Sequence, residues 1–188
     1  IIINTRNFGC IRSPFYGLLQ AKGDAVIFLN SDFQDPPELI PNYIENWEKG
    51  HKITLGQKTK TKEIIFMKYL KRIYYRTLNL ISTVNLPLYT TGSGIYDQKI
   101  IEQLRQIKDP YPYLRGLVAE FEDEINLIQF EEPKRLGGKT KSNFFTYYDY
   151  VILGLVKHSS MPLRLIIFLG FVSSLLSFVS ALIYLFYK

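Results

Sequence analysis

The chain has 188 residues, enough for one α/β domain with a substantial core, and its single cysteine, Cys10, excludes an internal disulfide framework. Its formal net charge is +6, yet it carries no zinc spacing, helix-turn-helix signature or aromatic RNA-binding motif, which argues against nucleic acid as a partner. It opens within an apolar run, on isoleucine rather than methionine, and we therefore expect it to be a fragment of a longer protein.

The first elements are a strand end and a helix. Residues 1–3 are isoleucines, which we expect to close a strand. Residues 4–12 then turn through Gly9 into a helix that should run to about Lys22, where Gly23 supplies a stop signal.

A short apolar run over residues 26–29 predicts a buried strand of a parallel sheet. Polar residues follow it directly: Asn30, Ser31, Asp32, Gln34 and Asp35. Ligands of open α/β sheets bind just past the carboxyl ends of strands, and clustered oxygen atoms there suit a hard cation. A solvated turn before an acidic helix start would give the same spacing, so the acids alone leave both interpretations open.

The middle of the chain alternates between helical and strand patterns. Apolar spacing and turn residues predict helices over 36–50, 67–84, 98–107 and 114–120, strands over 53–56 and 125–130, a glycine-rich loop over 90–97 and a rigid turn over 109–113. Between residues 58 and 76, seven lysines and arginines against one glutamate leave an excess of six positive charges. That segment suits anionic lipid or a phosphorylated substrate, with a solvated helix face as the alternative.

The C-terminus has the composition of a membrane anchor. Residues 142–158 are aromatic and amphipathic, which is typical of a helix lying in the membrane interface. Residues 163–187 are apolar with no charge after Arg164, and they exceed the roughly 20 residues that span a bilayer. A buried core helix is disfavoured because the run is apolar on every side. Lys157 and Arg164 stand at its start, which places the preceding domain in the cytoplasm.

Three motifs resemble one enzyme family. Asn30-Ser31-Asp32 followed by residues 33–38 is similar to the metal-binding segment of inverting GT-A glycosyltransferases of family 2. The branch is the one that loads sugars onto polyprenyl phosphates, including dolichol-phosphate mannose synthase and bacterial undecaprenyl-phosphate glycosyltransferases. Residues 6–9 (Arg-Asn-Phe-Gly) and residues 133–141 (PKRLGGKTK) match two further family motifs. The chain departs from the family at Asn30, where an acid is usual, and at residues 92–94, which replace an acid and an arginine.

The resemblance implies the architecture. It predicts an α/β, Rossmann-like GT-A domain with a mostly parallel sheet over residues 1–141, incomplete at its N-terminus. Interfacial amphipathic helices over 142–162 and a transmembrane helix over 163–187 should follow. The implied location is the inner (cytoplasmic) membrane, with the catalytic domain facing the cytoplasm.

The resemblance also implies the chemistry. The enzyme would move a sugar from a nucleotide-diphosphate sugar to a dolichyl or undecaprenyl phosphate with inversion, for cell-envelope polysaccharide or glycoconjugate synthesis. Mg²⁺ or Mn²⁺ would be held by Asp32 and Gln34, aided by Asn30, and the catalytic residues would be Asp32 and Asp35. The residues implied in donor and phosphate binding are Arg6, Asn7, Gly9, Arg135, Lys139 and Lys141. A homo-oligomer is left open.

Two alternatives remain at this level. A processive polysaccharide synthase shares the fold, but the Gln-x-x-Arg-Trp product motif of such enzymes is absent from this sequence. A catalytically impaired, membrane-anchored scaffold is the other, because Asn30 brings no charge to the cation. We expect Asn30→Asp to be tolerated, since it restores the usual acid.

Overall fold

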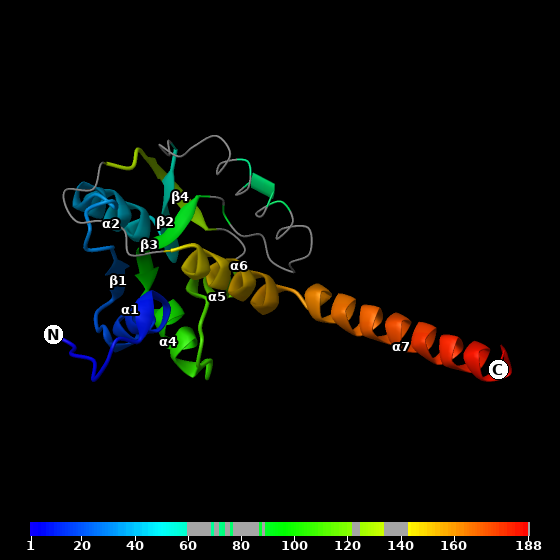
Figure 1. The fold of residues 1–188 in the computed structure, drawn as a ribbon. Helices are drawn as coiled ribbons and strands as arrows, with labels where there is room; N and C mark the ends of the chain where they lie inside the picture. The colour runs from blue at the N-terminus through cyan, green and yellow to red at the C-terminus, as the bar shows by residue number, and fades with distance from the viewer. Residues whose placement is uncertain are drawn as a thin grey trace.

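A computed structural model describes residues 1–59, 89–121, 125–133 and 143–187, together with residues 69, 72, 73, 76 and 87. In these residues a mixed sheet carries helices on both faces, and a long helix extends away from it (Figure 1). The helix predicted over 67–84 lies largely outside the described residues, although residues 69, 72, 73 and 76 are helical.

The sheet has the order β1 (Ala25–Phe28), β3 (Thr90–Asp97), β2 (Ile53–Lys58) and β4 (Asn126–Phe130). Strand β3 is antiparallel to both of its neighbours, whereas β2 and β4 are parallel. Strands β1, β2 and β4 therefore run in one direction, and their carboxyl ends meet at one edge of the sheet. This arrangement confirms the predicted α/β class. The sheet is mixed, because β3 runs against both of its neighbours, and among the described strands β1 pairs only with β3.

Strand β3 corrects the sequence interpretation of residues 90–97 as a glycine-rich loop, which was wrong. The segment pairs with β1 on one side and β2 on the other. Gly94 serves the pairing rather than a turn: its φ is 156°, and a Cβ there would clash with the carbonyl oxygen of Thr54. Only glycine allows the two backbones to approach this closely.

The core lies between the sheet and helices α1 (Gly9–Gln20), α4 (Gln98–Gln106) and α5 (Leu114–Phe121). Its buried residues come from all of these elements: Phe15, Leu18, Val26, Ile53, Leu55, Tyr96, Ile100, Ile101, Leu104 and Val118. Side chains alternate between faces along a strand, and Gly56, next to Leu55, faces Tyr43 of α2 (Ile40–Glu48). Helix α2, which follows the short 3₁₀ helix η1 (Pro37–Leu39), therefore covers the other face.

The remaining predicted helices form within a few residues of their expected bounds, but the first strand does not. Residues 1–4 have no strand pairing in the structure, and Ile1 and Ile3 are exposed. The prediction of a strand end at residues 1–3 was therefore wrong for this chain. An apolar run forms a strand only where a neighbouring strand is present to pair with it.

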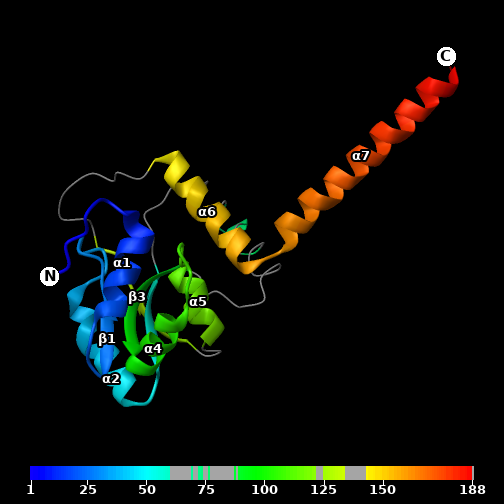
Figure 2. The same ribbon diagram turned by 90° about the horizontal axis from the view of Figure 1, so that it is seen from below.

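Helix α6 (Phe144–His158) connects the domain to the C-terminal helix. Its Leu153 and Leu155 pack beside Tyr113 and Ala119. Large side chains elsewhere on the helix form an exposed stripe at near-helical spacing, which we call the α6 stripe: Phe145, Tyr148, Ile152 and Val156. Figure 2 shows α6 lying beside the domain and leading into α7. A helix with one packed side and one exposed apolar side suits a membrane interface.

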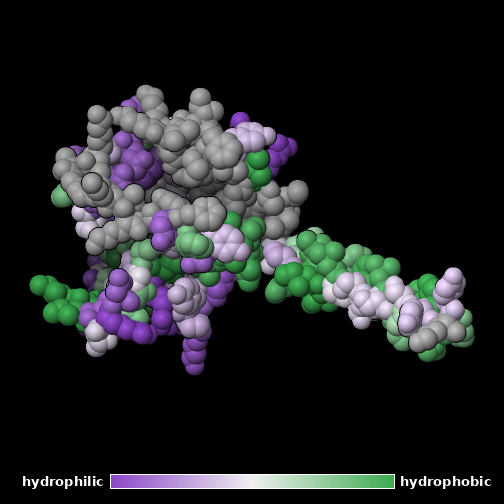
Figure 3. All heavy atoms as spheres, in the orientation of Figure 1, coloured by the Kyte–Doolittle hydropathy of each residue, from purple (hydrophilic) through white to green (hydrophobic). Residues whose placement is uncertain are grey.

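Helix α7 (Met161–Tyr187) projects away from the domain, and its most apolar window is 0% buried. Figure 3 shows hydrophobic side chains along much of its exposed surface. By length and composition, α7 is able to cross a membrane. Since no part of the described chain covers it, the helix indicates that the protein associates with a membrane.

Candidate functional site

The polar residues that follow β1 form a tight turn. The backbone N–H of Gln34 donates to Asp32 Oδ1 at 3.2 Å. Between them, Phe33 has a φ of 57°, a left-handed conformation that is uncommon for a bulky residue. Strained residues of this kind persist where the surroundings fix them, and they concentrate at functional sites. The turn thus sets Asp32 and Gln34 at the edge where the parallel strands end.

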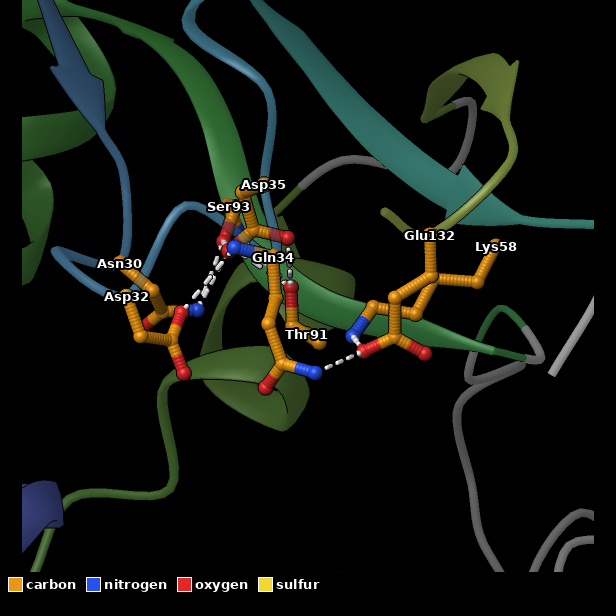
Figure 4. Close-up of polar contacts among 8 residues, drawn as sticks. All are labelled: Asn30, Asp32, Gln34, Asp35, Lys58, Thr91, Ser93 and Glu132. Atoms are coloured by element: carbon orange, nitrogen blue, oxygen red, sulfur yellow. Dashed lines mark hydrogen bonds and ion pairs between the residues drawn. The ribbon is translucent and has the colours of Figure 1, made fainter. Parts of the chain in front are cut away.

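Asp35 lies beneath this turn and is only 1% exposed. Its carboxylate accepts hydrogen bonds from Ser93 Oγ at 2.5 Å, from Thr91 Oγ1 at 3.5 Å and from Asn30 Nδ2 (Figure 4). These three donors are neutral, and two of them come from β3. Asp35 therefore fastens the turn to the central strand of the sheet.

The charge of Asp35 also affects Tyr43 on α2. Burial, with a smaller contribution from the Asp35 carboxylate, raises the pKa of Tyr43 to about 12. The Tyr43 hydroxyl is accommodated by Gly56, where a Cβ would lie 2.6 Å from the hydroxyl oxygen. This part of the sheet edge is closely packed, with little space for a ligand.

A second group of polar residues joins the ends of β2 and β4. Glu132 Oε1 accepts from Lys58 Nζ at 2.7 Å and from Gln34 Nε2 at 2.9 Å (Figure 4). The parallel register pairs Lys58 with Phe130, so Glu132, two residues further along, reaches the lysine. The side chains of Lys58 and Glu132 are 14% and 20% exposed. We call the two groups together the acidic rim: Asn30, Asp32, Gln34, Asp35, Lys58, Thr91, Ser93 and Glu132.

The acidic rim has a donor set that fits a hard cation. Mg²⁺ is usually held by one or two carboxylates together with substrate phosphates, so a closed protein cage is not required. In the described part of the chain no three His, Cys, Asp or Glu side chains form such a cage. Asp32 offers a partly exposed carboxylate, and Gln34 directs its amide nitrogen at Glu132, which leaves its carbonyl oxygen on the other side. The amide nitrogen of Asn30 is directed at Asp35 and Ser93, so only its Oδ1 could bind a metal.

The residues predicted to bind the donor lie in two places. The first place is the start of α1, where Arg6, Asn7 and Gly9 lie. There Asn7 Oδ1 accepts a hydrogen bond from the Gly9 N–H at 2.8 Å. The guanidinium carbon of Arg6 lies 5.0 Å from the centre of the Phe8 ring. The first turn of α1 is beside the acidic rim, because Cys10 and Ile11 line the same hollow as Asn30. Arg135, Lys139 and Lys141 lie outside the described residues, so their role stays a prediction.

The motif search of the sequence missed four residues that the structure brings to this site. Thr91 and Ser93 were assigned to a loop, Glu132 had no partner in sequence, and Arg115 was only a helix residue. The hydrogen bonds that Thr91, Ser93 and Glu132 make with Gln34 or Asp35 join positions 56 to 98 residues apart in the chain, and that of Arg115 with Thr90 joins positions 25 residues apart. The strand order, with β3 between β1 and β2, brings Thr91 and Ser93 to the site, and the register of β2 and β4 brings Glu132 there.

Comparison with known proteins defines the family. Residues 1–105 match the model of glycosyl transferase family 2. The chain belongs to glycosyltransferase family 2. Among its relatives, the "Uncharacterized glycosyltransferase YkcC" of Bacillus subtilis (strain 168) is 30% identical over 189 residues, covering 100% of the chain and 58% of the relative.

Two other relatives have names that include bactoprenol. The "Prophage bactoprenol glucosyl transferase homolog" of Escherichia coli (strain K12) is 25% identical, covering 93% of the chain and 58% of that protein. The "Bactoprenol glucosyl transferase" of Shigella phage SfV is 26% identical, covering 93% of the chain and 57% of that protein. The chain therefore spans somewhat more than half the length of the relatives it matches.

Proposed function

We propose that the complete protein transfers a sugar from a nucleotide-diphosphate sugar to a polyprenyl phosphate in the membrane. Membership of glycosyltransferase family 2 supports the reaction class. The names of the bactoprenol glucosyl transferases support the lipid acceptor. The observation that carries the proposal is the acidic rim, where Asp32 and Gln34 are partly exposed just past the carboxyl end of β1.

The chemistry requires little from a protein base. An oxygen of the lipid phosphate attacks the anomeric carbon of the donor sugar, and the bond from that carbon to the diphosphate oxygen breaks. The electron pair leaves with the nucleoside diphosphate, and the configuration at the anomeric carbon inverts. Because the attacking oxygen is already anionic, no proton has to be removed from it.

The chain's own residues act on the charge of the leaving group. A bound Mg²⁺ or Mn²⁺ would supply Lewis-acid stabilisation of the departing diphosphate. Asp32 and Gln34 would hold that ion, and Glu132 would keep the Gln34 amide turned so that its oxygen faces the ion. Arg135, Lys139 and Lys141 would bind the phosphates from the segment that follows Pro133.

The membrane location follows from the C-terminal helices. Helix α7 would span the inner membrane, and the α6 stripe would lie at its surface. The cations Lys157 and Arg164 stand at the start of the span, which favours a catalytic domain in the cytoplasm. Both substrates of the proposed reaction meet at that surface, one dissolved in the cytoplasm and one held in the bilayer.

The test is sugar transfer by the complete protein in membranes or nanodiscs. Labelled nucleotide-diphosphate sugars are offered one at a time with undecaprenyl phosphate, with Mg²⁺, with Mn²⁺ or with a chelator. We expect one donor to give a lipid-soluble labelled product whose formation stops with the chelator. A protein that binds a donor but transfers no sugar to any polyprenyl phosphate would support the scaffold alternative instead.

A further inference from the structure

A hollow of about 370 Å³ adjoins the acidic rim on the side of α5. Asn30 and Thr91 belong to both the rim and the hollow, and Arg115 supplies a cation in its wall. The other walls are mainly apolar, with Ile11, Phe15, Phe28, Pro112 and Leu114 among them. An apolar site with one fixed cation suits an amphiphile with an anionic head.

Arg115 is held in a defined orientation. Its Nη1 donates to the Thr90 carbonyl oxygen at 2.9 Å, and its guanidinium carbon lies 5.2 Å from the centre of the Tyr113 ring. Both contacts fix the guanidinium beside the first residue of β3, Thr90. A guanidinium that is already ordered loses less entropy when it binds a phosphate.

A second hollow, of about 510 Å³, adjoins the first. Cys10, Ile11 and Tyr150 line both hollows, and the Cys10 thiol contacts the Tyr150 hydroxyl between them. The second hollow runs between α1 and α6, and Ile152 and Val156 of the α6 stripe form part of its wall. It therefore opens on the side of α6 that leads to α7.

The two hollows, which we together call the groove, differ in the charge of their lining residues. Arg115 lines the hollow next to the acidic rim, whereas Asp149 lines the hollow on α6. An anionic head group is attracted by the Arg115 guanidinium and repelled by the Asp149 carboxylate. The head of an amphiphile should thus lie beside the rim, and its chain should extend toward the membrane.

We infer that the groove from Arg115 to Ile152 binds the acceptor, with the phosphate of a polyprenyl lipid at Arg115 and its first prenyl units along Cys10, Tyr150 and Ile152. This inference rests on the proposed function and assigns the acceptor to residues outside the sequence motifs. A nucleotide-diphosphate sugar has no long apolar part, so it does not explain the apolar residues that line both hollows. The groove also brings the lipid phosphate to the rim where the donor diphosphate would be held.

Cys10 provides a direct measure of occupancy, because it is exposed and lines both hollows. The complete protein in nanodiscs is treated with a maleimide, and alkylation of Cys10 is followed by mass spectrometry. Undecaprenyl phosphate should slow the reaction in proportion to its mole fraction. Undecaprenol at the same mole fraction, inorganic phosphate and nucleotide-diphosphate sugars should have much weaker effects.

Two substitutions locate the phosphate and the prenyl chain. Arg115→Gln should raise the lipid mole fraction needed for half-protection about tenfold, and Arg115→Lys should restore part of the effect. The matched control is Arg105→Gln, because Arg105 also donates to backbone carbonyl oxygens, those of Leu19 and Ala21.

Ile152→Glu should weaken protection about tenfold as well. Its control is Ile44→Glu on α2, since Ile44 and Ile152 are each 39% exposed.

The outcomes separate this inference from the proposed function. Protection of Cys10 by the donor sugar rather than the lipid would overturn the inference, as would equal protection by undecaprenol or an unchanged response in Arg115→Gln. If transfer occurs but both groove variants keep the wild-type KM for the lipid, the function stands and the site is wrong. If the lipid protects Cys10 through Arg115 but no sugar is transferred, the site stands and the function is wrong.

Discussion

Asp35 and Glu132 are carboxylates on the same rim, and their surroundings differ in kind. Asp35 is 1% exposed and accepts hydrogen bonds from two hydroxyl groups and one amide. Glu132 is partly exposed, pairs with a lysine and reaches the amide of Gln34. A carboxylate enclosed by neutral donors fixes the backbone, whereas a partly exposed one can orient a neighbouring ligand group. We therefore expect Asp35 to hold the turn in place and Glu132 to orient the Gln34 amide.

The largest expected effect is that of substituting Asp32, a third carboxylate of the acidic rim, which is partly exposed. In the complete protein, Asp32→Ala should lower the metal-stimulated rate about 10²-fold, or ~3 kcal/mol, because it removes the charged oxygen donor. The initial rate is measured against Mg²⁺ or Mn²⁺ concentration. Asp32→Asn is the matched control, since it keeps an oxygen that can accept from the Gln34 N–H. An unchanged rate and metal midpoint in Asp32→Ala would show that the metal is held elsewhere.

The next effect tests whether Asp35 is structural. Asn30→Asp should reduce the stability of the protein by about 2 kcal/mol, because a hydrogen-bond donor to Asp35 becomes a second carboxylate beside it. This is the opposite of the tolerance expected from the sequence. Thermal unfolding in detergent gives the comparison, and the double variant Asn30→Asp with Asp35→Asn should recover more than half of the loss. A single variant as stable as the wild type would mean that the contact with Asp35 carries little energy.

Glu132 should influence metal affinity more than stability. Glu132→Gln removes the charge that orients the Gln34 amide, and groups that orient metal ligands commonly change affinity about tenfold. Mn²⁺ binding in the presence of a nucleoside diphosphate, followed by electron paramagnetic resonance, measures this without turnover. Glu131→Gln alters the exposed neighbouring residue and should leave the affinity unchanged. Equal affinities in all three proteins would remove Glu132 from the site.

The smallest effect concerns an ion pair away from the rim. Lys157 Nζ on α6 donates to Asp109 Oδ2 at 2.7 Å, and their side chains are 34% and 15% exposed. Burial raises the pKa of Asp109, but hydrogen bonds from Lys157 and from the Tyr111 N–H outweigh it and bring the pKa below its usual value. The pair's stabilisation is therefore present above the unfolded pKa of an aspartate, about 4, and is lost as pH falls through the lower folded value.

Partial exposure screens this pair, so Asp109→Asn should cost only about 0.5 kcal/mol at pH 7. The variant should also show a smaller fall in stability between pH 7 and pH 3 than the wild type does. Unfolding midpoints at the two pH values give the result. A variant that loses as much stability on acidification as the wild type would assign the pH dependence to other carboxylates.

The sequence was sufficient for the features with local signals. Helical spacing predicted α2, α4 and α5, the apolar run predicted β1, and the uncharged C-terminal run predicted α7. The family resemblance predicted the class, which the match to glycosyltransferase family 2 confirms. These features depend on residues close together in the chain.

The features that sequence reasoning missed depend on pairing between distant segments. Glycines normally signal a turn, but Gly94 lets β3 lie against β2 because that neighbour's backbone is already in place. Asp35 was predicted to be catalytic from its motif, and that role stays a prediction; what the motif did not indicate is that the hydroxyls of Thr91 and Ser93 enclose it. Glu132 could be recognised only after the register of β2 and β4 was known.

The serines of α7 have a consequence for how this helix would lie in a bilayer. Ser173, Ser177 and Ser180 each donate to a carbonyl oxygen three or four residues earlier in the same helix, at 2.8–3.0 Å. Their hydroxyl protons are therefore satisfied before any contact with hydrocarbon or with another helix. As far as these serines are concerned, the segment can remain a solitary span, and a neighbouring helix would have to compete with bonds already made.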